Sequence, residues 1–94
     1  MALPSKGAMT RFRAKVWDGN TWIRFRNPKR FLDFLQKTDK AKIARFKFYR
    51  WPEEFVVKNS EGTWWVDYNL YNLLRTQNKD DVISYLRFLF FEHK

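Results

Sequence analysis

The sequence contains no cysteine and few of the residues that interrupt regular structure. Among its 94 residues, three are glycine and three are proline. Without cysteine, the chain has no disulfide bond, no thiolate metal ligand and no thiol nucleophile. The scarcity of glycine and proline leaves no linker, no low-complexity segment and no glycine-rich phosphate loop. The chain is therefore expected to be stabilised by a packed core alone.

Long apolar runs are also missing. No uninterrupted apolar stretch approaches the ~18 residues that a membrane-spanning helix requires. The N-terminal residues 1–9 lack the apolar run of a signal peptide. We therefore predict a cytoplasmic protein with a flexible leader over residues 1–9 and a single domain over residues 10–94.

Aromatic residues and positive charge are abundant. The chain is 45% hydrophobic and 20% aromatic, which is too apolar for a disordered basic tail. Its net charge of +9 is unevenly distributed, because residues 1–50 sum to +11 and residues 51–94 sum to −2. A segment with this much uncancelled positive charge is suited to attracting a polyanion, and nucleic acid is the first partner to consider.

Alternation of apolar and charged residues predicts a hairpin near the N-terminus. It covers residues 10–17 and resumes over residues 21–26, around an Asp-Gly-Asn sequence that tolerates positive φ. A turn at Asp18-Gly19 would place Arg13 opposite Arg24, whereas a turn at Gly19-Asn20 would place Lys15 opposite Arg24. In either register, the apolar residues share one face and the cations share the other.

Capping signals place two helices. Asn27 before Pro28 predicts a helix over residues 28–37. Asn78, followed by acidic residues, predicts a second helix that continues to the end of the sequence. Further strands are predicted over residues 42–51, 55–58 and 63–68, and a helical turn over residues 70–74. The order β-β-α-β-β-β-α indicates an α+β fold, with an antiparallel-rich sheet of about five strands and two helices packed on one face.

The outer face of the sheet is predicted to combine cations with aromatic rings. Like charges opposed across strands destabilise a sheet by a few tenths of a kcal/mol or more, and a polyanion would offset this cost. Trp17, Trp22, Tyr49 and Trp51 are expected among these cations. Cations that follow phosphates, beside rings that stack on bases, favour single-stranded DNA or RNA over duplex. The predicted nucleic-acid-binding residues are Arg11, Arg13, Lys15, Trp17, Trp22, Arg24, Arg26, Lys29, Arg30, Arg45, Lys47 and Tyr49.

The sequence offers little for catalysis or metal binding. Its single histidine, His93, lies beside the last residue, where fraying is expected. The adjacent acid pairs Glu53-Glu54 and Asp80-Asp81 are consistent with a turn and a helix cap, and no cluster of oxygen ligands is evident. We therefore predict a protein that is not an enzyme and that has no cofactor and no metal site.

Exposed apolar residues suggest a protein contact. Residues 85–91 are apolar nearly all round, so a helix there cannot bury every side chain against the sheet. Of the adjacent pair Trp64 and Trp65, only one can face the core, and Trp65 is expected to face outward. The predicted protein-interface residues are Trp65, Phe88 and Phe91, with a homodimer formed through the C-terminal helix. Burial against the other helix is the alternative.

Other interpretations of the basic surface remain open. A small inhibitor or adaptor, of the kind that viruses and mobile elements encode, could dock a basic aromatic surface on an acidic host protein. Binding to an anionic membrane would use the same charge, although neither predicted helix is clearly basic and amphipathic. The cations could also form an ordinary solvated face, with their stems packed over the indoles.

Overall fold

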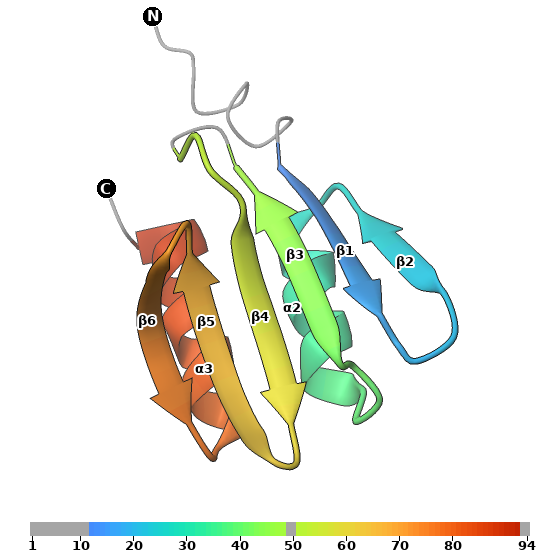
Figure 1. Cartoon of the computed structure of the whole chain (residues 1–94). Helices are drawn as coiled ribbons and strands as arrows, with labels where there is room; N and C mark the ends of the chain where they lie inside the picture. Colours follow the sequence, from blue (N-terminus) through green and yellow to red (C-terminus); the bar gives the residue numbers. More distant parts are fainter. Residues whose placement is uncertain (1–11, 49–50, 93–94) are drawn as a thin grey trace, which may run out of the picture.

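One antiparallel sheet forms the body of the molecule. The computed structural model describes residues 12–48 and 51–92. The strands pair in the order β2-β1-β3-β4-β5-β6, each antiparallel to its neighbours (Figure 1). Their bounds are β1 Arg13–Trp17, β2 Trp22–Phe25, β3 Ile43–Lys47, β4 Phe55–Ser60, β5 Thr63–Tyr68 and β6 Tyr71–Thr76.

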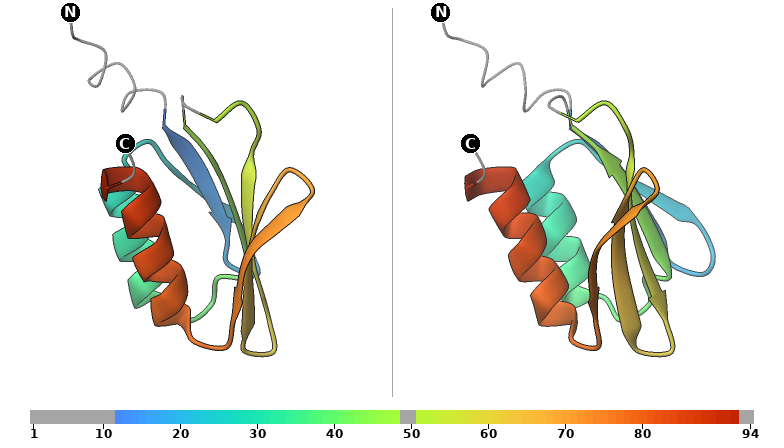
Figure 2. Two further views of the ribbon diagram at one scale, coloured as in Figure 1. Left: turned by 90° about the vertical axis from the view of Figure 1, so that its left-hand side faces the viewer. Right: turned by 60° about the vertical axis from the view of Figure 1, so that its left-hand side comes forward.

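Two helices cover one face of this sheet (Figure 2). They are α2 (Pro28–Lys37) and α3 (Lys79–Arg87), and the π-helical segment η1 (Phe88–Glu92) follows α3 directly. The Asn27 side chain accepts hydrogen bonds from two backbone N–H groups in the first turn of α2, at 2.8 and 3.1 Å. Asn78 caps α3 in the same way, at 2.9 Å. Both predicted caps are therefore confirmed, because a short polar side chain satisfies free N–H groups at a helix start.

The core lies between the sheet and the helices and combines aliphatic side chains with a cluster of phenylalanine rings. Phe46 of β3 stacks on Phe55 of β4, with ring centroids 4.7 Å apart and planes inclined by 5°. Phe31 contributes from α2 and lies 5.6 Å from Phe46. Phe90 of η1 meets the Phe46 ring edge-on at 5.1 Å. Strands and both helical segments therefore contribute to one core.

The predicted α+β fold is confirmed, but the sheet has six strands instead of about five. The prediction of a helical turn over residues 70–74 is wrong, because Leu70 lies in a turn and the residues after it form strand β6. Leu70, Leu73 and Leu74 have the spacing of a helix face, which produced the error. Asn69 adopts the left-handed conformation, with φ 58°, and the chain reverses there and pairs with β5. Tertiary pairing thus overrides the local pattern.

Two further expectations concern the ends of the chain. The predicted leader, residues 1–9, lies outside the described residues. The last helix does not continue as a regular α-helix, since α3 ends at Arg87 and η1 follows. Within residues 12–48 and 51–92, no helix combines the length and the apolar character needed to cross a membrane.

Candidate nucleic-acid interface

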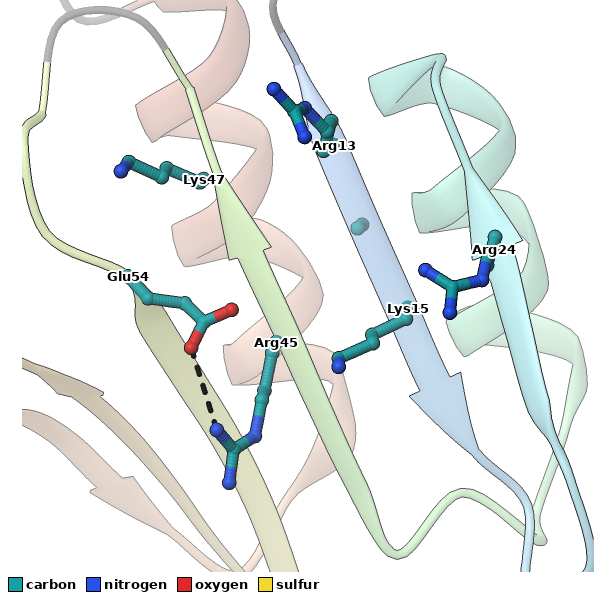
Figure 3. Close-up of a pocket in the computed structure, with 7 residues that line it drawn as sticks. Arg13, Lys15, Arg24, Arg45, Lys47 and Glu54 are labelled. Carbon is teal, nitrogen blue, oxygen red and sulfur yellow. Dashed lines mark hydrogen bonds and ion pairs between the residues drawn. The ribbon is translucent and has the colours of Figure 1, made fainter.

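The side of the sheet that the helices leave open carries five cations on three adjacent strands. Lys15 of β1 lies opposite Arg24 of β2 and opposite Arg45 of β3. Arg13 of β1 lies opposite Lys47 of β3. We call these five residues the basic face. They surround a depression of about 510 Å³, and Glu54 lies at its rim (Figure 3).

The turn of the first hairpin sets this arrangement. Of the two registers considered, the structure adopts the one with its turn at Gly19-Asn20, so Lys15 opposes Arg24. Gly19 has φ +97°, a conformation that side chains other than glycine rarely adopt. Ala14 and Val16 consequently face the core, while Lys15 between them faces outward.

Asp18 stabilises the same turn. Its carboxylate accepts hydrogen bonds from the backbone N–H groups of Thr21 and Asn20, each at 2.9 Å. These bonds hold the pKa of Asp18 below its usual value, because they favour the ionised carboxyl. An ionised acid therefore contributes to the turn that sets the register of the cations.

The basic face is only slightly neutralised by acids. Arg45 forms an ion pair with Glu54, with an N–O distance of 3.5 Å, and the dashed line in Figure 3 marks this contact. Within the described part of the chain, no ion pair involves the other four cations, which are Arg13, Lys15, Arg24 and Lys47. The arrangement therefore retains strong positive potential on one side of the sheet.

Two indoles lie at the hairpin end of the basic face. Trp17 and Trp22 are cross-strand partners, and their ring centroids are 5.4 Å apart with planes inclined by 54°. The Nζ atom of Lys15 lies 4.7 Å from the centroid of the Trp22 ring, a cation–π contact. The residue Trp22 is still 36% exposed. Cation and ring are thus adjacent, as the predicted site requires.

A second depression adjoins the basic face at the edge of the sheet. Arg24 lines both depressions, and in the second it is joined by Arg26 and Arg30 from the end of β2 and the start of α2. Lys29 does not line either one. It forms an ion pair with Asp33 one helical turn away, with an N–O distance of 3.8 Å. Of the remaining predicted residues, Arg11 and Tyr49 lie outside the described residues.

Trp51 does not lie on the outer face, so this expectation is wrong. Its ring packs against Phe55 at 5.6 Å and Tyr68 at 5.3 Å, beside the core. Strand β3 ends at Lys47, and beyond this end the backbone N–H of Trp51 donates a hydrogen bond to the carbonyl of Phe48 at 2.9 Å. Strict alternation applies only within a strand, so it does not determine the side taken by a residue beyond its end.

The sequence analysis did not predict the ion pairs on the outer face. Glu54 reaches Arg45 because β3 pairs with β4, and pairing between strands cannot be read from alternation. On the next two strands, Lys58 pairs with Asp67 at 3.2 Å and lies 6.0 Å from the Trp65 ring. These strands therefore carry an aromatic ring and a paired cation on the open side.

The predicted protein-interface residues are exposed to different degrees. Trp65 is partly buried on the outer side of β5, whereas Trp64 is buried. Phe88 and Phe91 of η1 are each 45% exposed, while Phe90 between them packs on the core. Their role in a protein contact stays a prediction.

Comparisons with known proteins give no functional assignment. No protein-family model matches the chain, and no significant similarity was found to a curated protein or to a solved structure. Among residues 12–48 and 51–92, no three acidic, histidine or cysteine side chains are grouped as a metal would require.

Proposed function

We propose that the protein is a non-catalytic nucleic-acid-binding protein that binds through the basic face, with single strands preferred to duplex. The observation that carries this proposal is the cross-strand placement of Arg24, Lys15 and Arg45 in one row. Facing Cβ atoms in such a row are about 5 Å apart, so the charges repel one another. A chain of phosphates placed along the row would replace this repulsion with attraction and release counterions into solution.

The indole pair supports the preference for single strands. Trp22 is partly exposed beside Lys15, so a cation for a phosphate and a ring for a base lie next to each other. Stacking of a base on such a ring contributes roughly 1–3 kcal/mol, and it requires a base that is not already stacked in a duplex. The basic face is also a sheet surface, whereas proteins that recognise duplex DNA commonly place a helix in the major groove.

A titration of tryptophan fluorescence with mixed-sequence oligonucleotides tests the proposal. At about 50 mM salt, a single-stranded oligomer should quench the emission, and the logarithm of affinity should fall linearly with the logarithm of salt. Arg24→Ala should weaken binding without unfolding the protein. Arg87→Ala, which removes the same charge at the end of α3, is the matched control and should have a smaller effect.

Trp22→Ala examines the stacking contribution. It should weaken single-stranded binding by roughly 1–3 kcal/mol and weaken duplex binding less. Equal losses on both would contradict stacking, and the absence of binding to any oligomer at low salt would refute the proposed function.

One observation favours a second candidate, an acidic protein partner. The Arg45–Glu54 pair shows that a carboxylate fits against the basic face. A small inhibitor or adaptor could therefore dock this face on an acidic protein surface. A competition experiment with poly-glutamate distinguishes the two candidates. If the protein recognises phosphates and bases, poly-glutamate should displace a bound oligonucleotide poorly. If the basic face binds carboxylates of an acidic protein, poly-glutamate should displace the oligonucleotide readily.

A further inference from the structure

The positive surface does not end at the edge of the sheet. Arg24 lines the depression of the basic face, and it also lines the depression that contains Arg26 and Arg30. Within the described residues, none of these three arginines forms an ion pair. Figure 2 shows that the chain after β2 crosses from the sheet layer to the helix layer at this place. A continuous basic surface therefore passes over the β2 edge.

The opposite side of the basic face carries carboxylates instead. Glu54 lies against Arg45, and Asp67 lies 3.2 Å from Lys58 on the neighbouring strands. These carboxylates cancel the charges of Arg45 and Lys58, so a phosphate placed there would find less uncompensated positive charge than at the β2 edge. Electrostatics therefore directs a bound polyanion away from β4 and β5 and toward β2.

We propose that a bound single strand leaves the basic face over the β2 edge and continues onto Arg26 and Arg30 at the start of α2. This inference rests on the proposed function and adds the route that the ligand takes over the surface. A strand on this route must bend from one layer of the molecule to the other. Duplex DNA has a persistence length of about 150 base pairs and cannot follow such a bend, whereas a flexible single strand can.

The route predicts a length-dependent role for Arg30, and Lys29 provides a matched control. Lys29 is adjacent to Arg30 on α2 and carries the same charge, but it lines neither depression and is paired with Asp33. We therefore compare Arg30→Ala with Lys29→Ala. Each variant is titrated with a short oligonucleotide of about 4 nucleotides and a long one of about 16 nucleotides, lengths that span typical site sizes for a single fold.

Arg30→Ala should weaken binding of the long oligonucleotide about fivefold and leave binding of the short one unchanged. The slope of log affinity against log salt should become shallower by about 0.7 for the long oligonucleotide, the value for one phosphate contact on a single strand. Lys29→Ala should change neither slope. Arg26→Gln should reproduce the length dependence from the β2 side of the same depression.

The outcomes separate this inference from the proposed function. If the unmodified protein binds the oligonucleotides but the Arg30 and Lys29 variants behave alike, the route is refuted and binding through the basic face stands. Equal weakening of the short and long oligonucleotides by Arg30→Ala would also refute the route. If the unmodified protein binds neither oligonucleotide, the proposed function and the route are both refuted.

Discussion

The two faces of the sheet contain residues from the same strands but have opposite character. In β3, Phe46 is 1% exposed and surrounded by rings, whereas its neighbours Arg45 and Lys47 are exposed beside other cations. In β1, Val16 is buried and Lys15 faces outward. A step of one residue therefore separates a position that stabilises the fold from one that concentrates charge. Stability and the proposed binding should accordingly respond to different substitutions.

The largest expected effect is the destabilisation caused by a substitution on the face of the sheet that the helices cover. Phe46→Ala removes a ring that stacks on Phe55 at 4.7 Å and contacts Phe31 and Phe90. We expect the free energy of unfolding to fall by about 3–5 kcal/mol, because lost burial and a residual cavity add together. Urea denaturation followed by circular dichroism measures this change.

The adjacent residue Arg45 supplies the comparison for this measurement. Arg45→Ala should change stability by about 0.5 kcal/mol or less, because its ion pair with Glu54 is exposed to solvent. Equal destabilisation by the Phe46 and Arg45 variants would contradict the separation between the faces.

On the open face of the sheet, we expect a substitution to increase the free energy of unfolding by a small amount. Arg13 lies opposite Lys47, and like charges in this position disfavour the folded sheet. Arg13→Gln should raise the free energy of unfolding at low salt by a few tenths of a kcal/mol while weakening oligonucleotide binding. Added salt should stabilise the unmodified protein through screening and should stabilise this variant less. A destabilised Arg13→Gln protein would show that the repulsion is not significant.

The smallest effect concerns the turn that joins β1 and β2. The pKa of Asp18 is lower in the folded protein than in the unfolded chain, so its stabilising contribution is complete above the unfolded pKa. That contribution is lost as the pH falls through the folded pKa. Relative to Asp18→Asn, the unmodified protein should therefore lose stability on acidification, which thermal unfolding at several pH values measures. A difference between the two proteins that does not vary with pH would contradict this role.

Local chemistry explains why much of the fold could be predicted. Asn27 and Asn78 satisfy free N–H groups at helix starts, and this signal depends only on neighbouring residues. Alternation likewise predicted which side chains of β1 and β3 face the core. Strand β6 was missed because its leucines have the spacing of a helix face and only pairing with β5 distinguishes the two structures.

The sequence predicted which cations form the candidate site, but it did not predict which residues surround them. Alternation correctly placed Lys15, Arg24 and Arg45 on the outer face. The neighbours of these residues depend on the order of strands in the sheet. Strand β1 pairs with β3, although β2 and α2 separate the two in the sequence. The contact of Glu54 with Arg45 depends on the pairing of β3 with β4, and Trp51 packs against the core because it lies beyond the end of β3. Neither could be inferred from neighbouring residues.

The position of Phe90 has a consequence for how the chain folds. This ring lies edge-on to Phe12, 5.2 Å away, although almost the whole described chain separates the two residues. Contacts between such distant residues slow folding, because a large loop must close before they form. The hairpins can form early from local interactions, whereas the aromatic core is complete only when η1 docks. Removal of η1 should therefore leave a collapsed state with mobile rings instead of a smaller native fold.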